Sequence, residues 1–306
     1  MTGIIYAPGC EGIDPATAIR QSWLKEPTPA DVFHKYMAGN SDSSPAKSLG
    51  TNTHKYLLQP DAFAMLRVLP AGSRAKLDDV DAMIKAVEVI ANDFNCFPDP
   101  MSDDAKLPER KAYLDACIAN CQAAGVSFID GSKLAPISAM VAAVREIPEA
   151  RAMIEHPLAI KERTFIWRDV NGIARQMTPD LLIPPCEEYP VGIIPDFKTT
   201  SAVSADAFGR DAINYNYHWQ ADWYSDGFQA FFGVRNEWRW IAVRSEPLHH
   251  AWLFTPPAGL LESAPAEYQS RFEALANAIQ TGTFPGYPKT AMELPLPSWK
   301  RNQLNR

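Results

Sequence analysis

The chain has 306 residues, of which 46% are hydrophobic and 21% charged, and its formal net charge at pH 7 is −7. This composition is that of a globular protein and excludes a fibrous or disordered chain. The acidic charge argues against an ordinary nucleic-acid-binding surface, which is commonly basic, although carboxylates around metal ions would add to it. The longest nearly apolar run, residues 134–144, is shorter than the roughly 20 residues of a membrane helix. No N-terminal signal pattern is present, and five cysteines without CxxC spacing favour reduced thiols, so we expect a cytoplasmic protein without membrane contact.

The first 160 residues predict a mainly helical region. Apolar spacing and breaker residues favour helices over residues 15–36 (interrupted at two prolines), 51–60, 78–92, 111–124 and 135–145. Loops are expected over 39–50 and 93–108, where Gly, Ser, Asp and Pro are frequent.

The pattern then changes from helices to strands. Residues 162–183 predict two strands joined by a turn at Asn171-Gly172, and 191–200 predict a strand buried on both faces. A long helix over 206–232, a strand over 238–245 and a helix over 262–280 are expected to follow. The sequence therefore predicts an α/β fold with a central mixed sheet flanked by helices. We expect one domain, comprising a helical region (1–160), an α/β core (161–256) and a C-terminal helix with a tail (257–306).

Two acidic residues and a lysine fall at the ends of adjacent predicted strands. Asp180 ends the second hairpin strand, and Asp196 lies near the end of the next strand, so strands about 4.8 Å apart could bring both carboxylates to one cation. Lys198 shares a strand face with Asp196, where its ammonium could position a water or offset charge on a phosphate. Mg²⁺ is commonly held by carboxylates and substrate phosphates. The alternative is that the acids cap strands and Lys198 is a solvated strand end.

These residues resemble the signature of a known nuclease superfamily. Pro179-Asp180 followed by Asp196-Phe197-Lys198 resembles the PD-(D/E)xK pattern. The order of further motifs resembles the exonuclease VIII (RecE-type) and RecB-like branch: Gly50-x-x-x-His54, a Glu162 that opens the hairpin, Tyr217-His218-x-Gln220-x-x-x-Tyr224, and the strand end VRSEP at 243–247. The resemblance covers about residues 22–247.

The resemblance implies a restriction-endonuclease-like fold and assigns roles to the matching residues. Metal ligands would be His54, Asp180, Asp196 and Phe197, and Lys198 would be the catalytic lysine. Glu162 could bind a second metal or its water, or could simply start a strand. Gln220, Tyr224 and Tyr217 could orient DNA or the metal-bound water, although both tyrosines could equally be core aromatics. A helical histidine such as His54 could also be a structural residue.

The same resemblance implies an Mg²⁺-dependent exonuclease, with Mn²⁺ as a substitute. Such enzymes degrade one strand of double-stranded DNA from a 5′ end and leave a 3′ overhang, which a single-strand annealing protein uses in recombination in phages, prophages and bacteria. No cysteine follows Cys186, so the iron–sulfur cluster of some RecB-like nucleases cannot be built. An acidic chain with few obvious Lys and Arg clusters should bind phosphates weakly, so we expect a ring-like homo-oligomer that encloses DNA.

Three alternatives remain at the level of sequence. One is a RecB-like nuclease of other polarity or an endonuclease, which would use the same residues. Another is a DNA-binding module with an inactive site, although every catalytic side chain is present. The third is a metal-binding protein that is not a nuclease.

Overall fold

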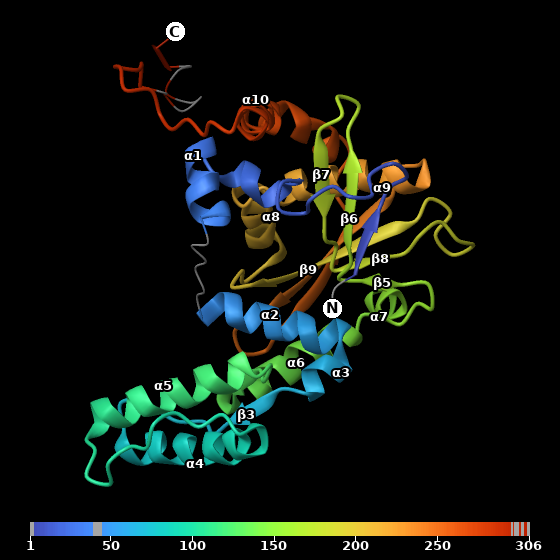
Figure 1. Cartoon of the computed structure of the whole chain (residues 1–306). Coiled ribbons are helices and arrows are strands. Elements are labelled where there is room, and N and C mark those ends of the chain that lie inside the picture. The colour runs from blue at the N-terminus through green and yellow to red at the C-terminus, as the bar shows by residue number, and fades with distance from the viewer. Residues whose placement is uncertain (1–2, 39–44, 295, 297–299, 301–302, 305–306) are drawn as a thin grey trace.

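The fold is a mixed α/β arrangement, seen in a computed structural model that describes residues 3–38, 45–294, 296, 300 and 303–304 (Figure 1). The longer helices are α2 (Pro45–Leu58), α4 (Leu77–Phe94), α5 (Leu107–Ala123), α6 (Leu134–Arg145), α8 (Ala205–Asn214), α9 (Tyr217–Phe232) and α10 (Leu260–Thr281). Shorter helices are α1 (Pro29–Val32), α3 (Pro60–Ala64) and α7 (Pro148–Ile154). None of the helices in the described part of the chain has the length and apolar character needed to cross a membrane.

The strands form mixed sheets, as the sequence predicts. β9 (Ile193–Thr200) pairs in parallel with β10 (Glu237–Arg244), which pairs antiparallel with β11 (Ala251–Phe254). A second sheet has the order β1-β6-β7-β2, and two short pairs complete the set. Their strands are β1 (Ile4–Tyr6), β2 (Ile19–Arg20), β3 (Arg67–Leu69), β4 (Phe128–Asp130), β5 (Ile160–Lys161), β6 (Thr164–Arg168), β7 (Ala174–Met177) and β8 (Leu181–Leu182).

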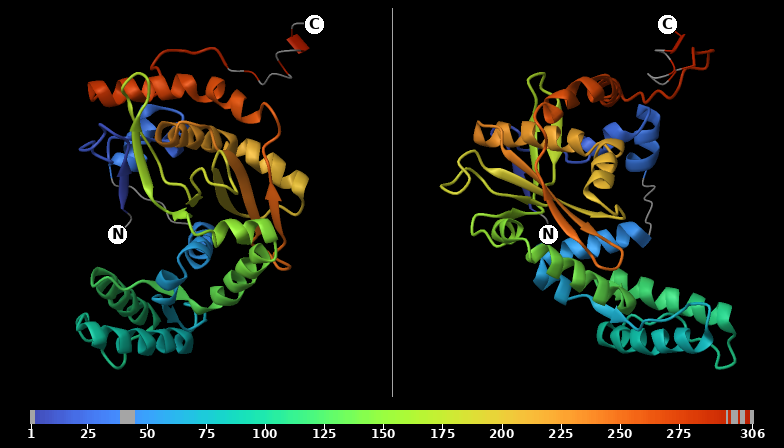
Figure 2. Two further views of the ribbon diagram at one scale, coloured as in Figure 1. Left: turned by 90° about the vertical axis from the view of Figure 1, so that its right-hand side faces the viewer. Right: turned by 180° about the vertical axis from the view of Figure 1, so that it is seen from behind.

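The β9–β10 sheet separates two hydrophobic clusters. Because side chains alternate along a strand, Ile194 and Trp240 belong to the cluster that includes residues of α9 and α10. Ile193, Phe197 and Ile241 belong to the cluster that includes residues of α2, α6 and α7. Figure 2 shows these two groups of helices on opposite sides of the sheet. The prediction of a strand buried on both faces is therefore confirmed for β9.

A third hydrophobic cluster lies apart from the sheet. Helices α4 and α5 pack against each other through buried residues such as Val87 and Leu114, and β3 pairs with β4 at their base. Figure 1 shows this helix pair projecting away from the rest of the molecule. Both helices agree with the periodicity of the sequence, whereas the two strands were not expected.

Several local predictions need correction. Helix α2 begins at Pro45, inside the loop predicted over 39–50, while residues 39–44 lie outside the described part. The helix predicted over 206–232 is two helices, because Asn216 between them has a left-handed φ of 55°. The segment predicted as helical over 15–36 contains β2, which pairs in parallel with β7. In this last case, long-range pairing overrides the local helical pattern.

Candidate active site

Asp196, Lys198 and Gln220 form a closed set of contacts at the middle of β9. Asp196 is 1% exposed, and its Oδ2 forms an ion pair with the Lys198 ammonium. Gln220, from α9, donates from Nε2 to Asp196 Oδ1 at 2.9 Å and accepts from Lys198 Nζ at 3.2 Å. The two strand residues share a face, as their spacing predicts, and α9 supplies the third member.

Asp180 reaches the same place from the start of β8. The backbone N–H of Phe197 donates to Asp180 Oδ2 at 2.8 Å, which fixes one oxygen beside β9. His54, on α2, places Nδ1 3.5 Å from the other oxygen. The second strand of the predicted hairpin is shorter than expected. It ends at Met177, so Asp180 lies between β7 and β8 and not at the end of one long strand.

Gly50 allows α2 to approach β9 closely enough for this contact. A Cβ at position 50 would lie 2.8 Å from Thr199 Oγ1, which is closer than real Cβ atoms come to other atoms. His54 follows Gly50 by four residues and so lies on the same face of α2. The Gly50-x-x-x-His54 spacing therefore has a steric explanation.

Glu162 adds a third carboxylate next to Asp180. Its backbone has an uncommon φ of 49°, and its N–H donates to the Asp180 carbonyl oxygen at 3.2 Å. Its side chain accepts a short hydrogen bond from Gln59 Nε2, a residue that the sequence motifs did not indicate. Burial and the charge of Asp180 raise the pKa of Glu162.

The two central carboxyl groups have pKa values displaced in opposite directions. Burial, and then Asp180, raise the pKa of Asp196 against the pull of Lys198. Burial would also raise the pKa of Asp180, but His54 and Lys198 outweigh it and lower that pKa. In turn, Asp180 outweighs the burial of His54 and raises the imidazole pKa. Paired groups displaced in this way are typical of functional sites.

The residues present fit a hard divalent cation. Such a cation takes carboxylate oxygens, and His54 offers a nitrogen. Asp196 Oδ2 is buried, and among the described residues the group that pairs with it is the Lys198 ammonium. The Phe197 side chain is a buried hydrocarbon, so its backbone carbonyl is the group that could serve as a ligand. Within the described ranges, the side-chain ligand atoms of His54, Asp180 and Asp196 do not all lie within 4.8 Å of one another.

The two tyrosines lie beside this centre and also pack against the core. Tyr224 donates its hydroxyl to the Thr178 carbonyl at 3.2 Å, which braces the segment before Asp180. The Tyr217 ring centroid is 5.0 Å from Lys198 Nζ. Both side chains contact the cluster that includes α9, which agrees with the core-aromatic alternative. A role in binding substrate stays a prediction for both.

Lys25 lies near the centre and was not indicated by any motif. It ends a short 3₁₀ helix, Gln21–Lys25, and its Nζ is 5.8 Å from the Tyr217 ring centroid. Desolvation, and then repulsion by Lys198, lower the pKa of Lys25 to about 8, although Asp196 opposes the shift. A single lysine distant in sequence carries no pattern, so only the fold reveals it.

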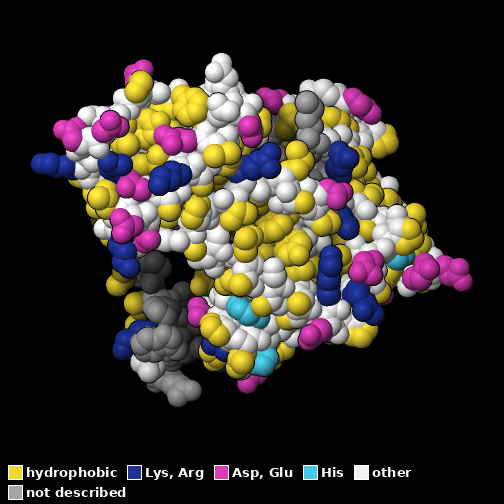
Figure 3. All heavy atoms as spheres, turned by 90° about the horizontal axis from the view of Figure 1, so that it is seen from below, with side chains coloured by type: hydrophobic (Ala, Val, Ile, Leu, Met, Phe, Trp, Pro, Cys, Tyr) yellow, Lys and Arg dark blue, Asp and Glu magenta, His cyan; other side chains and the backbone are white. Residues whose placement is uncertain are grey.

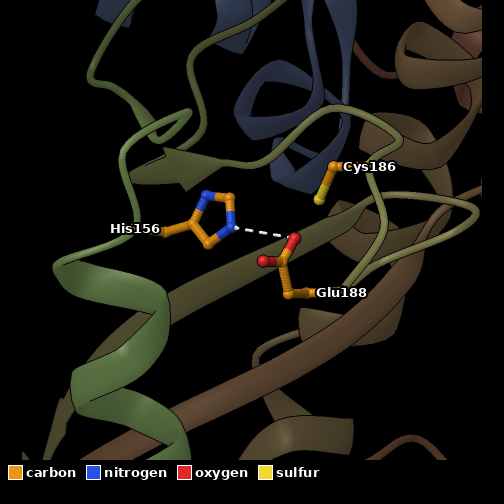
Figure 4. A group of neighbouring side chains, drawn as sticks. All are labelled: His156, Cys186 and Glu188. Carbon is orange, nitrogen blue, oxygen red and sulfur yellow. Dashed lines mark ion pairs between the residues drawn. The ribbon is translucent and has the colours of Figure 1, made fainter.

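A second group of potential metal ligands lies elsewhere on the molecule (Figure 4). His156, Cys186 and Glu188 each offer a ligand atom, and these atoms lie within 4.8 Å of one another. However, the backbone N–H of Leu158 donates to His156 Nδ1 at 3.2 Å, so the neutral ring carries its proton on Nε2, the nitrogen that faces Glu188. Metal-binding histidines usually donate from their second nitrogen instead. This geometry opposes a cation at His156.

Comparison with known proteins places the chain in a family. Residues 131–292, more than half of the chain, match the family described as PDDEXK-like domain of unknown function (DUF3799). The matched segment includes Glu162, Asp180, Asp196, Lys198 and Gln220 but not His54 or Lys25. No curated protein matches significantly.

Solved structures support the fold. A crystal structure of a candidate exonuclease from Eubacterium rectale matches with a TM-score of 0.53 and 10% sequence identity, over 94% of this chain and 93% of that chain. A second structure, of a protein named SSO0001, has 10% identity over 77% of this chain and 87% of that one. Its TM-score is 0.25, which supports no structural argument. The predicted α/β class with a mixed sheet flanked by helices is confirmed.

Proposed function

Since the chain belongs to the family of PDDEXK-like domains of unknown function, we propose that it is a metal-dependent deoxyribonuclease that hydrolyses phosphodiester bonds. The observation that carries this proposal is the contact set of Asp196, Lys198 and Gln220, with Asp180 and His54 beside it. Carboxylate oxygens and an imidazole can hold a cation, and a fixed ammonium beside that cation can offset charge on a phosphate, so the centre brings together groups that this hydrolysis can use.

Each of these residues has a distinct role in the proposal. His54, Asp180, Asp196 and the Phe197 carbonyl would hold the cation, which when bound supplies an acidified water and polarises the phosphoryl group. Lys198 offsets negative charge that develops on the phosphate. Gln220 forms hydrogen bonds with both Asp196 and Lys198 and so fixes the orientation of their side chains relative to each other.

The mode of cutting is a further part of the proposal. We favour a 5′-to-3′ exonuclease on double-stranded DNA that uses Mg²⁺, or Mn²⁺ in its place, and leaves 3′ overhangs for a recombination partner. The support is the order of motifs from Gly50 to the VRSEP strand end, together with the exonuclease name given to the structurally similar protein. An endonuclease or an inactive DNA-binding module would share the fold and is therefore a possible outcome of the test.

A ring-like homo-oligomer would explain how such an enzyme stays on DNA. The chain is acidic overall, and Figure 3 shows Lys and Arg interspersed with Asp and Glu on the face seen from below, without one basic patch. Weak phosphate contacts then favour enclosure of the duplex over point attachment. Sedimentation should show a species larger than the 33.9 kDa monomer.

The test uses linear duplexes labelled at the 5′ or 3′ end and a covalently closed circle, each with Mg²⁺, Mn²⁺ or EDTA. We expect early release of the 5′ label, survival of the 3′ label and the circle, and no reaction in EDTA. Nicking of the circle would favour the endonuclease. Binding without cutting under every condition would favour the inactive module.

A further inference from the structure

A pocket with both polar and apolar lining lies beside the proposed reaction centre, where the parallel strands β9 and β10 end. Its volume is about 580 Å³, within the roughly 300–1,000 Å³ common for ligand sites. Thr199 and Thr200 at the end of β9 and Ser245 just after β10 line it. Ligands of α/β proteins bind outside the carboxyl ends of parallel strands. The position of the pocket therefore favours a binding role.

The pocket connects to the reaction centre through Tyr217. This residue lines the pocket, and its ring centroid is 5.0 Å from Lys198 Nζ. Leu49 of α2 and Asp211 of α8 line other parts, and Figure 1 shows these two helices on opposite sides of the end of β9. A molecule in the pocket would thus adjoin a phosphate held at Lys198.

Tyr215 presents an exposed aromatic ring to this pocket. It lies at the break between α8 and α9, next to Asn216 with its left-handed backbone. Tyr215 is 58% exposed, and its ring centroid is 5.9 Å from that of Tyr217. Core packing does not account for a tyrosine this exposed. Exposed aromatic rings in nucleic-acid-binding proteins commonly stack on bases.

The charges around the pocket favour a base over a phosphate. Asp211 and Glu246 supply two carboxylates, whereas Lys133 supplies one ammonium. A phosphate would meet net repulsion there, while the N–H groups of a neutral base could donate to carboxylate oxygens. Thr200 Oγ1 donates to Asp211 Oδ2 at 3.4 Å and leaves further acceptor sites on that carboxylate.

We propose that this pocket holds a nucleobase of the DNA strand whose phosphate lies at Lys198, and that Tyr215 stacks on that base. The inference rests on the nuclease function proposed above and specifies its substrate. A base held in a protein pocket has left its duplex, so the strand is unpaired at this point. The substrate class is therefore single-stranded DNA or a frayed duplex end.

The test measures binding of a fluorescent single-stranded oligodeoxynucleotide by anisotropy in EDTA, where hydrolysis is not supported. Tyr215→Ala is expected to weaken binding about tenfold, whereas Tyr215→Phe and Tyr215→Trp retain it. Tyr287→Ala is the matched control, because Tyr287 is 64% exposed and lies outside this pocket. A series of oligonucleotides with one abasic position each should identify a position where base removal weakens binding and Tyr215→Ala adds no further loss.

Equal binding by the Tyr215→Ala and Tyr287→Ala proteins would overturn the inference. A Tyr215→Ala loss that is the same at every abasic position would also overturn it, as would no oligonucleotide binding by the unaltered protein. The nuclease proposal fails separately. If the protein cuts no DNA with Mg²⁺ or Mn²⁺, but Tyr215→Ala weakens binding at all but one abasic position, the nuclease proposal fails and the base-binding site stands.

Discussion

Two histidines in this molecule lie next to carboxylates at similar distances, and they differ in what surrounds them. His54 Nδ1 is 3.5 Å from Asp180, and His156 Nε2 is 3.8 Å from Glu188. The His156 group is the more compact, since its three potential ligand atoms lie within 4.8 Å of one another. Proximity alone would favour the wrong centre for the proposed chemistry.

The difference lies in the neighbouring groups. Asp196, beside the His54 centre, is 1% exposed and contacts a lysine and a glutamine from two different elements. In contrast, the Glu188 side chain is 66% exposed. The Leu158 N–H donates to His156 Nδ1, so the neutral His156 ring points its Nε2 proton toward Glu188. A buried, hydrogen-bonded carboxylate beside a fixed cation is a better indication of a reaction centre than three ligand atoms close together.

The largest effect is expected for the carboxylate and lysine of β9. Asp196→Asn and Lys198→Ala should each lower DNA cleavage by at least about 100-fold. The first variant loses a carboxylate charge that would hold the cation, and the second loses the ammonium that would offset charge on the phosphate. Asp196→Asn should stay folded, since burial already disfavours the charged form of Asp196, as its raised pKa shows, and the asparagine amide has nearly the same shape without the charge. Plasmid and oligonucleotide cleavage with Mg²⁺ measures both. Glu188→Gln, the same kind of change at the second centre, should cut normally; near wild-type cleavage by both β9 variants would refute the assignment.

Metal affinity should separate the two histidines. His54→Ala is expected to weaken Mn²⁺ binding about tenfold or more in calorimetry and to leave melting without metal nearly unchanged. His156→Ala should bind Mn²⁺ like the unaltered protein. An active His54→Ala enzyme with a lowered melting temperature would instead make His54 a structural residue.

The stability of the metal-free protein should depend on pH through His54 and Asp180. The raised pKa of His54 means that its pairing with Asp180 stabilises the metal-free protein fully below about pH 6.5, the unfolded value, and less as pH rises through the folded pKa. The lowered pKa of Asp180 removes this contribution again in strong acid.

A cation requires neutral His54, so stabilisation by Mn²⁺ should have the opposite trend. We expect the rise in melting temperature caused by Mn²⁺, measured from about pH 5 to 8, to become smaller as pH falls. The trend should disappear in His54→Ala and persist in His156→Ala. A Mn²⁺-induced rise in melting temperature that does not depend on pH would argue against the imidazole as a ligand.

The smallest effect is expected for Lys25, which lies near the first centre alone. Lys25→Ala should weaken single-stranded DNA binding a few-fold and reduce the slope of affinity against salt by about 0.7, the value for one phosphate contact. The loss should be clear at pH 7 and smaller above pH 8, because the Lys25 pKa of about 8 leaves less charge to remove. Lys289→Ala, at an exposed position in the C-terminal segment, is the control; an identical salt slope in both variants would exclude a phosphate contact by Lys25.

Much of the fold could be predicted because it depends on short-range pattern. The Asn171-Gly172 turn, the helices α4 to α6 and the buried strand β9 follow from spacing and turn residues within about twenty positions. The shared face of Asp196 and Lys198 follows from strand alternation in the same way.

The remaining features depend on contacts between distant segments. β2 pairs with β7 more than 150 residues later, and Lys25 approaches Asp196 only because the chain folds back. Gln59 meets Glu162 through the same kind of long-range contact. The break at Asn216 was missed because asparagine is compatible with helix in local pattern, although it also tolerates a left-handed backbone.

The size of the residue at position 50 affects how closely α2 approaches β9. An added methyl group there would meet Thr199 Oγ1 at 2.8 Å, so either the Thr199 side chain must rotate or α2 must shift outward from the sheet. Where α2 shifts, His54 moves with it, and the imidazole changes position while every proposed ligand keeps its chemical identity. If the proposed cation binds at this centre, its affinity should depend on the distance between α2 and β9, so a substitution at Gly50 would change that affinity without altering a proposed ligand.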